Sequence, residues 1–497
     1  MDQTREFGLL SAPLFLLIPV IFIIVKHISS LSSKRRPLPP GPRPWPIVGN
    51  IFLLEKKLHI PMTRFAKVHG PLISLRLGMQ VVVVGSSPAA ATEILKNHDR
   101  LLSARWQSKV IPRKSHELER ISVIWNPTCN DQWKSFRALF RTELFSAKAI
   151  DSQASLREKK SSEMVEFLTA RQGKVINIGE LVFATIFDTI SNLLFSKDMI
   201  GLEDQEVASG LKSLVSRMME LAAAPNMADF YPILEGLDPQ GLRRKMSECV
   251  EEMIGVWEIY IKERREKHVN DAPITDFLDV FLSNGFDDDI INWLIVELFS
   301  AGVETNTTTV EWAMAEILKN KRVLEKLGEE LDKVINKGSI HESEVSQLPY
   351  LNALLKETMR LHPPAPFLLP HRALETFEVM NYTIPKDSQV FVNVWAIGRD
   401  PSVWEEPLSF KPERFLGSSL DLKGHDFELI PFSSGRRICP GLPMAIRQIP
   451  LILANLIHYF DWSFENDDDP AKLDMNDKFG ITLQKEKPLL MIPKKKF

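Results

Sequence analysis

The stretch "PFSSGRRICPG", residues 431–441, contains one of only three cysteines in this chain of 497 residues. Cys439 lies between Gly435 and Gly441 and directly before Pro440. A thiolate that binds a metal needs backbone N–H groups around its sulfur and little side-chain bulk where it meets a flat cofactor. The two glycines leave that space, and Pro440 removes one competing backbone donor. The stretch therefore predicts a metal-binding thiolate beside a planar cofactor.

Two further side chains of this stretch suit the same role. Arg437 has the charge to pair with a carboxylate on the cofactor, and Phe432 is placed to shield the sulfur from water. A solitary cysteine is more often a small buried hydrophobe, but the whole pattern resembles the haem-thiolate motif of the cytochromes P450. The resemblance implies haem b, with Cys439 as the axial ligand of the iron and with Phe432, Gly435, Arg437 and Gly441 around the cofactor.

The motif "KETMR" places Glu357 and Arg360 three residues apart, on one face of a predicted helix. Further along the chain, "FKPERF" adds Arg414. In the cytochromes P450 the matching residues form an ion-paired network on the cysteine side of the haem, and the resemblance implies such a network here. The alternative is an exposed pair of Glu357 and Arg360, which would contribute only ~0.2–0.5 kcal/mol.

Other motifs are similar to the segments of this family that hold the two haem propionates. "QWKSFR" provides Trp133 and Arg137, and "LLPHRA" provides His371. Together with Arg437, these residues are expected to bind the carboxylates of the cofactor. The alternative for His371 is a surface histidine.

The stretch "AGVETNTTTVEW", residues 301–312, resembles the family's oxygen-activating motif. The resemblance implies that Ala301 and Gly302 leave room over the iron, and that Glu304 and Thr305 relay the protons needed to split dioxygen. Short polar and β-branched residues form helices poorly, so the run also predicts a local distortion of the helix. A solvated threonine-rich face is the alternative, but the preceding "LIVELFSAG" is apolar. Many plant relatives carry Ser or Thr where this chain has Asn306, which puts the control of proton delivery in question.

The composition is that of an ordinary folded protein, with 44% hydrophobic and 25% charged residues. A net charge of −3 argues against nucleic acid as a partner. Cys129, Cys249 and Cys439 lie too far apart to suggest a disulfide framework or a zinc site. The chain is therefore expected in a reducing compartment.

The N-terminus carries an uncharged run, "FGLLSAPLFLLIPVIFIIV", over residues 7–25. As a helix its 19 residues would span ~29 Å, the thickness of a bilayer core. A cleaved signal peptide normally has a basic start and a shorter apolar run, so an uncleaved anchor is favoured. The lysines and arginines after the run predict that the rest of the chain lies in the cytosol. This is the arrangement expected of a single-pass protein of the endoplasmic reticulum membrane.

Three segments are expected along the chain. Residues 1–33 are the membrane anchor and stop-transfer segment, and residues 34–50 are a basic, proline-rich hinge. Residues 51–497 are the catalytic domain, with helical periodicity from about 130 to 360 and two short strands within residues 71–86. The predicted fold class is mainly α with small β-sheets, which is the cytochrome P450 fold preceded by a transmembrane helix.

Electrons must come from another protein, because no G-x-G-x-x-G dinucleotide motif follows a strand in this chain. The resemblance implies an NADPH–cytochrome P450 reductase as the partner and membrane lipid as the surroundings of the N-terminal helix. A haem protein without turnover is the alternative, and Glu304 and Thr305 argue against it because passive haem binding needs neither.

Stretches such as "RALETFEVMNYTIPKD" and "GRDPSVWEEPLSFKPERFL" resemble the plant alkaloid group that contains N-methylcoclaurine 3′-hydroxylase and littorine mutase. The resemblance implies a monooxygenase that oxidises a benzylisoquinoline or a tropane ester with O2. Hydrogen abstraction would be followed by hydroxyl rebound or by skeletal rearrangement. The alternative is hydroxylation of a terpenoid or phenolic metabolite.

The family's substrate-recognition regions fall on mainly apolar and aromatic residues, which suit a bulky aromatic substrate. The predicted pocket residues are Trp125, Val123, Phe367, Leu368, Phe479 and Ile481. Glu297 precedes Ala301 by one helical turn and is a candidate partner for a protonated alkaloid amine. The alternative is that Glu297 faces solvent or another helix.

Overall fold

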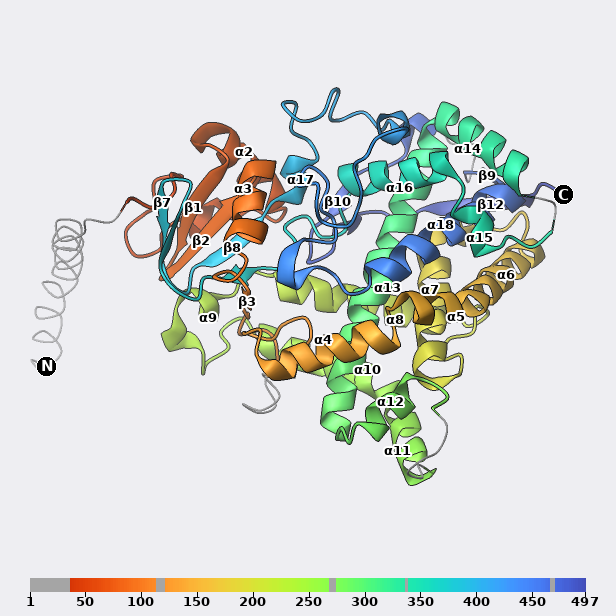
Figure 1. Cartoon of the computed structure of the whole chain (residues 1–497), viewed down its shortest axis with the longest axis horizontal. Helices are drawn as coiled ribbons and strands as arrows, with labels where there is room; N and C mark the ends of the chain where they lie inside the picture. Colours follow the sequence, from red (N-terminus) through yellow and green to blue (C-terminus); the bar gives the residue numbers. More distant parts are fainter. Residues whose placement is uncertain (1–35, 113–120, 268–273, 336–337, 465–469) are drawn as a thin grey trace, which may run out of the picture.

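The structure is a computed structural model that describes residues 36–112, 121–267, 274–335, 338–464 and 470–497. Helices dominate these residues and strands form small sheets, which confirms the predicted mainly α class (Figure 1). The helices are α2 (His59–His69), α3 (Pro88–Thr92), α4 (Asp131–Glu143), α5 (Ala147–Ser152), α6 (Ala154–Ala170), α7 (Ile178–Phe195), α8 (Gln205–Ala223), α9 (Met227–Phe230), α10 (Leu242–Gly255), α11 (Glu258–Lys267), α12 (Phe277–Ser283), α13 (Asp288–Lys319), α14 (Lys321–Val334), α15 (Glu342–Val345), α16 (Pro349–Leu361), α17 (Val394–Ile397) and α18 (Leu442–Tyr459). The anchor predicted within residues 1–33 lies outside the described residues.

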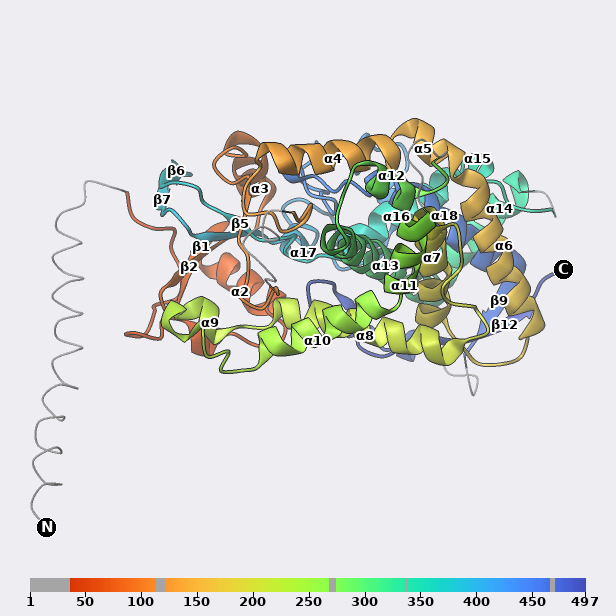
Figure 2. The same cartoon turned by 90° about the horizontal axis from the view of Figure 1, so that it is seen from below.

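Helix α13 runs through the centre of the molecule. Seen from below, α4 lies on one side of it and α8 with α10 on the other (Figure 2). Helix α13 packs against α7, α16 and α18 as well, so most of its 32 residues are buried.

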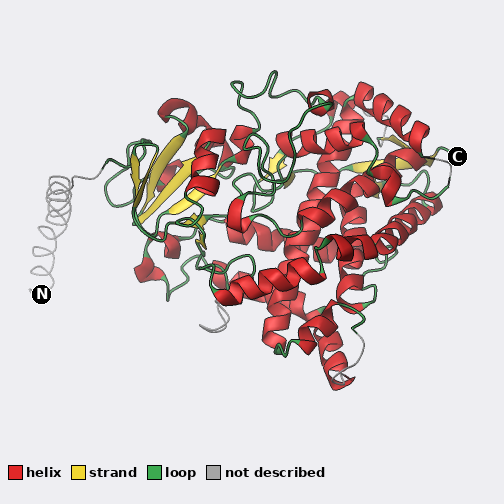
Figure 3. Ribbon diagram, in the orientation of Figure 1, coloured by secondary structure: helices red, strands yellow, loops and turns green. Residues whose placement is uncertain are grey.

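Most of the strands lie at one end of the molecule (Figure 3). The largest sheet has the order β1 (Leu72–Leu77), β2 (Gln80–Gly85), β8 (Gln389–Val392), β5 (His371–Arg372) and β3 (Ala104–Arg105). A three-stranded sheet consists of β4 (Ile176–Asn177), β12 (Leu490–Lys495) and β9 (Phe460–Ser463), and two pairs are formed by β6 (Phe377–Val379) with β7 (Tyr382–Ile384) and by β10 (Asp477–Lys478) with β11 (Gln484–Lys485).

The pair of strands predicted within residues 71–86 is confirmed. Strands β1 and β2 pair in antiparallel fashion around Gly78, which has a φ of +58°. A side chain there would lie 2.7 Å from the carbonyl oxygen of Phe230, so both conformation and space require glycine. Further across the sheet, the register of β3 and β5 sets Arg105 opposite His371. The sheet therefore carries two polar residues towards the site described below.

The distortion predicted for residues 301–312 is wrong at the level of secondary structure, because α13 is an unbroken α-helix from Asp288 to Lys319. The short polar side chains donate to carbonyl oxygens one turn earlier. Thr305 Oγ1 donates to Ala301 O at 2.6 Å, and Asn306 Nδ2 donates to Gly302 O at 2.5 Å. Such bonds satisfy the side chains without breaking the backbone ladder.

Among the described residues, one helix is long and apolar enough to cross a membrane by length and composition alone. It is α7, with a mean hydropathy of 1.5 over 18 residues, of which 83% are buried inside the molecule. Its Phe187 ring stacks on Phe299 of α13 with ring centroids 4.3 Å apart. Helix α7 is therefore a core helix that supports α13.

Candidate functional site

Cys439 lies between η6 (Gly435–Arg437) and the first turn of α18. Its backbone N–H donates to Phe432 O at 2.9 Å, and its sulfur accepts from the N–H groups of Gly441 and Leu442. Burial raises the pKa of the Cys439 thiol, and these two donors oppose that shift. The sulfur thus lies at the N-terminus of an 18-residue helix, where backbone N–H groups stabilise a thiolate.

The thiol of Cys439 adjoins open space although it lies deep in the fold. Its side chain is exposed, while burial within the protein still raises its pKa. Gly435 helps to form this loop with a φ of +66°, and a side chain there would lie 2.4 Å from Leu95 O. At Gly441 a Cβ would approach the Cys439 sulfur to 3.8 Å. The loop therefore presents a sulfur with free space beside it.

Arg437 is buried and only partly hydrogen-bonded. Its Nε donates to Ser103 O and its Nη2 to Asn126 O, both at 2.7 Å, while Nη1 has no partner. The guanidinium carbon lies 4.4 Å from the ring centroid of Trp133. The indole N–H of Trp133 donates to Val123 O at 3.0 Å, so this residue packs under Arg437 and its own donor is already used.

Arg105 joins Arg437, although its sequence context gave no sign of this. Its Nη1 donates to Leu369 O at 2.9 Å and lies 3.3 Å from His371 Nε2, while its buried Nε has no partner. His371 Nδ1 lies 2.6 Å from Leu102 O and must carry the proton, which leaves Nε2 to accept from Arg105. Burial, followed by the charge of Arg105, holds the pKa of His371 well below its usual value. His371 is therefore a neutral residue that supports Arg105, whereas the sequence analysis expected it to bind a carboxylate of the cofactor directly.

No carboxylate is hydrogen-bonded to this cluster of arginines within the described part of the chain. Burial lowers the pKa of Arg437 to about 10 and also lowers the pKa values of Arg105 and Arg137. Arg137 Nη2 donates to Ile438 O at 2.8 Å, next to the cysteine. The side-chain hydrogen bonds of these three arginines go instead to carbonyl oxygens, to His371 and to Cys129. Buried unpaired cations are costly, so the cluster fits a ligand that brings carboxylates.

Haem fits these residues on two independent grounds. Open space adjoins a cysteine sulfur at a helix N-terminus, which is the donor that a haem-thiolate site requires. Arg437 and Arg105 each retain a buried N–H group without a partner, as a pair of propionates would require. Cys439 would hold the iron, and Arg437, Arg105 and Arg137 would hold the carboxylates.

On α13, the motif residues face different ways. Ala301 is exposed in the middle of the helix and Thr305 is half-buried, so both border open space. A side chain at Gly302 would instead lie 2.8 Å from Ile190 Cδ1 of α7. Gly302 therefore allows α7 and α13 to approach closely, in place of the predicted role over the iron. Asn306 is buried and uses its amide within the helix.

Glu304 is almost fully buried, and its Oε2 has no hydrogen-bond partner. Burial raises the pKa of its carboxyl to about 7; the charges of Lys212 and Lys478 oppose this shift, and Glu311 adds to it. A carboxyl that titrates near neutrality both holds and releases a proton at the working pH. The side chain thus has the property that proton transfer next to Thr305 requires.

The pKa of Glu304 predicts a pH-dependent stability. The folded protein holds this proton up to about pH 7, whereas the unfolded chain releases it near 4.5. Between these values the folded state binds more protons, so the contribution of Glu304 to the free energy of unfolding falls as pH rises. Relative to the variant E304Q, the wild type should lose up to ~3 kcal/mol between about pH 5 and about pH 8. Thermal unfolding of both proteins across that range tests this, and a difference in Tm that stays constant with pH would contradict it.

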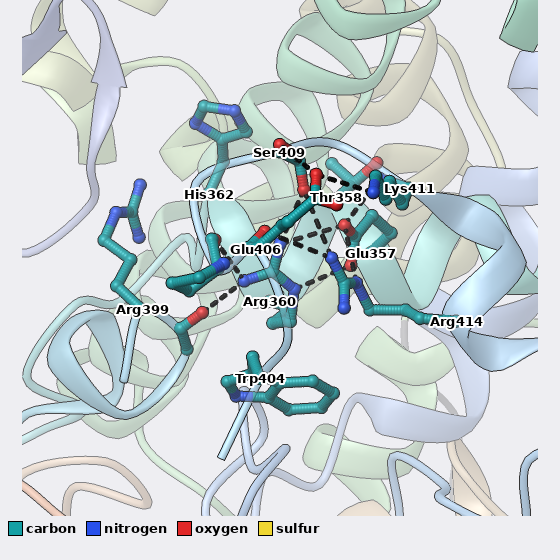
Figure 4. A network of polar contacts seen from close by, with 12 residues as sticks. Glu357, Thr358, Arg360, His362, Arg399, Trp404, Glu406, Ser409, Lys411 and Arg414 are labelled. Atoms are coloured by element: carbon teal, nitrogen blue, oxygen red, sulfur yellow. Dashed lines mark hydrogen bonds and ion pairs between the residues drawn. The ribbon is translucent and has the colours of Figure 1, made fainter. Parts of the chain in front are cut away.

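Glu357, Arg360 and Arg414 form a buried ion-paired network beside α16 (Figure 4). Glu357 Oε2 lies 2.7 Å from Arg360 Nε, and Glu357 Oε1 lies 3.0 Å from Arg414 Nε. The side chains of Glu357 and Arg360 are 0% exposed, so the alternative of an exposed surface pair does not apply. The backbone N–H of Lys411 also donates to Glu357 Oε1 at 2.7 Å, and Arg360 Nη1 donates to Pro407 O at 2.8 Å. The network thereby ties α16 to the segment before the cysteine loop.

A largely apolar pocket with about 1000 Å³ of empty space, part of it open to solvent, brings together five of the predicted pocket residues. These are Trp125, Phe367, Leu368, Phe479 and Ile481. The pocket is also lined by Met62 of α2, Phe230 of α9, Phe391 of β8 and Trp106, which follows β3 directly. These residues were missed because they come from elements that lie far apart in the sequence. The ring of Phe367 lies 5.5 Å from that of Phe391 and 6.1 Å from that of Phe479.

Two predicted pocket residues lie elsewhere. Val123 is buried in the main hydrophobic core. Glu297 is buried too, and its carboxylate accepts hydrogen bonds from Ser122, Val123 and Ile124. Burial raises the pKa of Glu297 to about 7 in spite of these bonds. Its two oxygens are therefore already occupied by protein donors.

The chain is similar to known proteins over almost its whole length. The family model described as "Cytochrome P450" matches residues 39–492. A probable (S)-N-methylcoclaurine 3′-hydroxylase isozyme 2 of Coptis japonica is 48% identical over 474 residues, which cover 95% of this chain and 96% of the relative. Corytuberine synthase of Coptis japonica is 44% identical, covering 98% of this chain and 99% of the relative. Geraniol 8-hydroxylase of Catharanthus roseus is 40% identical, covering 97% and 99%.

Proposed function

The chain belongs to the cytochrome P450 family and is a haem-dependent monooxygenase of its alkaloid hydroxylase group, and we propose that it hydroxylates a benzylisoquinoline alkaloid. The observation that carries this proposal is the joint occurrence of an aromatic pocket with 44–48% identity to enzymes named for N-methylcoclaurine and corytuberine. The rings of Phe367, Phe391 and Phe479 suit a bulky aromatic ligand.

The residues of the site divide the work between cofactor and proton transfer. Cys439 binds the haem iron through its sulfur, and Arg437, Arg105 and Arg137 bind the carboxylates. Bound haem supplies the iron that activates dioxygen for insertion into a substrate bond. Glu304 holds a proton on its carboxyl group and releases it near neutral pH, and Thr305, the next residue of α13, borders the open space.

Rearrangement of a tropane ester, as by a littorine mutase, has no structural observation in its favour. Asn306, the residue that departs from the pattern of many plant relatives, uses its amide inside the helix, where it donates to Gly302 O. Terpenoid hydroxylation is the second candidate, because geraniol 8-hydroxylase is 40% identical over 491 residues. The aromatic lining of the pocket favours the alkaloid.

Electrons reach the haem from a separate NADPH–cytochrome P450 reductase, since the chain has no dinucleotide motif of its own. Residues 1–33 anchor the protein in the endoplasmic reticulum membrane as a single-pass helix, and the basic hinge at 34–50 links this anchor to the cytosolic catalytic domain, 51–497.

Exposed apolar residues support that membrane position. Ile47, Met79 and Ile233 are 50%, 70% and 89% exposed. Hydrogen bonds from Met79 N to Phe230 O and from the Tyr231 hydroxyl to Ile47 O hold their three segments together. Ile47 belongs to the segment 34–50 that directly follows the predicted anchor, which suits contact of this patch with lipid.

The substrate proposal is tested by product mass. Membranes that contain the protein and a plant reductase are supplied with NADPH and with N-methylcoclaurine, littorine or geraniol in separate reactions. We expect N-methylcoclaurine to gain one oxygen atom. A product from geraniol alone, or a rearranged product from littorine alone, would overturn the proposed substrate while leaving the haem chemistry in place.

A further inference from the structure

Glu297 makes several hydrogen bonds to one short segment, residues 121–127, here called the roof segment. Ser122 Oγ donates to Glu297 Oε1, and the backbone N–H groups of Val123 and Ile124 lie 2.8 and 3.3 Å from Oε2. Ser122 Oγ in turn accepts from the N–H of Trp125 at 2.5 Å. A single carboxylate on α13 therefore organises four consecutive residues of the roof segment.

The roof segment connects the substrate pocket to the cofactor site. Trp125 lines the apolar pocket, and its carbonyl oxygen accepts from Gln107 Nε2 at 2.6 Å. One residue later, Asn126 O accepts from Arg437 Nη2 at 2.7 Å. Glu297 lies one helical turn before Ala301 on the same helix. A displacement of the roof segment would thus move Trp125 in the pocket.

The occupied oxygens of Glu297 argue against an ammonium partner in the substrate. The residue Glu297 is only 5% exposed. Its carboxylate accepts hydrogen bonds from one hydroxyl and two backbone N–H groups, and these bonds use most of its acceptor capacity. A substrate ammonium would have to displace these donors and leave backbone N–H groups buried without partners, at ~1–3 kcal/mol each. A substrate that packs against the pocket residues Phe367 and Phe479 breaks none of these hydrogen bonds.

We propose that Glu297 is a positioning residue that fixes the roof segment over the substrate pocket and so sets the pocket's shape. This role of Glu297 deepens the proposed function. It rests on the proposed function in one respect, namely that the apolar pocket binds the substrate. Glu297 acts through Ser122, Val123 and Ile124, and it contacts neither substrate nor cofactor. Charge-assisted bonds of this kind are stronger than neutral ones, which explains why a buried carboxylate is kept here.

The first test measures the order of the roof segment without any substrate. Amide hydrogen exchange is followed in the haem-loaded wild type, in E297A and in E297Q. E297A leaves Val123 and Ile124 without their acceptor, so we expect exchange over residues 121–127 to become about tenfold faster or more. E297Q keeps one carbonyl acceptor and the side-chain length, and it should restore most of the protection. Unchanged exchange in E297A would overturn the proposal.

A matched control comes from the same helix. Glu311 is also buried on α13 and accepts a backbone N–H, from Leu489 at 3.0 Å, but it does not contact the roof segment. E311A should therefore lower stability without changing exchange over residues 121–127. If E311A loosens the roof segment as much as E297A does, general weakening of α13 explains the effect and the proposal fails.

The second test separates positioning from charge recognition. Spectral titrations of the haem-loaded proteins compare N-methylcoclaurine, which carries an ammonium, with clotrimazole, a neutral azole at mildly alkaline pH. We expect E297A to weaken both ligands to a similar extent and E297Q to change neither by more than about threefold. Selective weakening of N-methylcoclaurine in E297Q, by about tenfold or more, would assign Glu297 to the substrate amine and contradict positioning. Failure of N-methylcoclaurine to bind the wild type would contradict the proposed substrate, and the exchange result would still decide the role of Glu297.

Discussion

Replacing Cys439 with serine is expected to abolish oxygenation and the absorption spectrum that a thiolate ligand gives to haem. The sulfur lies at the N-terminus of α18, accepts hydrogen bonds from two backbone N–H groups and adjoins open space. A serine hydroxyl has neither the electron density nor the low pKa that this position requires. Loss of an outer-shell partner of a metal costs ~10–100-fold in affinity or activity, and loss of the ligand itself should cost more.

The measurement for C439S is the difference spectrum of the reduced protein with and without carbon monoxide, together with product formation. Cys249 provides a matched control, because it is a buried thiol on α10 far along the chain from the haem loop. The variant C249A should keep the wild-type spectrum and turnover. A C439S protein with the thiolate-type spectrum or with ordinary turnover would show that another residue binds the iron.

Replacing Glu357 with alanine should destabilise the fold more than most single substitutions do. The carboxylate is 0% exposed and bonds both Arg360 and Arg414, so its removal leaves the buried guanidinium group of Arg360 and the partly buried one of Arg414 without their anion. Breaking a buried pair in this way costs ~3–5 kcal/mol, a large part of the stability of a typical protein. We expect E357A to give little haem-loaded protein at growth temperature and a clearly lower Tm for what remains.

The control for E357A is an exposed pair with similar helical spacing. Lys321 and Glu325 on α14 are 87% and 59% exposed and lie 3.8 Å apart. The variant E325A should change the free energy of unfolding by less than about 0.5 kcal/mol. If E357A proved as mild as E325A in thermal unfolding and haem content, the network would not be the stabilising element described here.

The parts of the site that sequence predicted lie close together along the chain. The cysteine loop, its glycines and Arg437 fall within residues 432–441, and Glu357 and Arg360 are separated by one helical turn. Local geometry fixes such groups, because a turn or a helix face places its own residues. The aromatic pocket was also largely foreseen, with Trp125, Phe367 and Phe479 lining it.

The parts that sequence did not predict depend on packing between distant elements. Arg105 reaches the cation cluster because β3 pairs with β5, and that register sets it opposite His371. Gly302 faces Ile190 because α7 packs on α13 at that point. Glu297 meets the roof segment and not a ligand, since its side chain faces residues some 175 positions earlier in the chain. No local pattern encodes such contacts, because they arise only when the helices and sheet assemble.

The most direct test of the account is the source of the oxygen in the product. The wild type and C439S are each reconstituted with a reductase and NADPH, and N-methylcoclaurine is oxidised under dioxygen made of the heavy isotope. The account predicts a product from the wild type that carries one heavy oxygen atom, and no product from C439S. A product whose added oxygen comes from water, or equal products from both proteins, would contradict a haem-thiolate monooxygenase centred on Cys439.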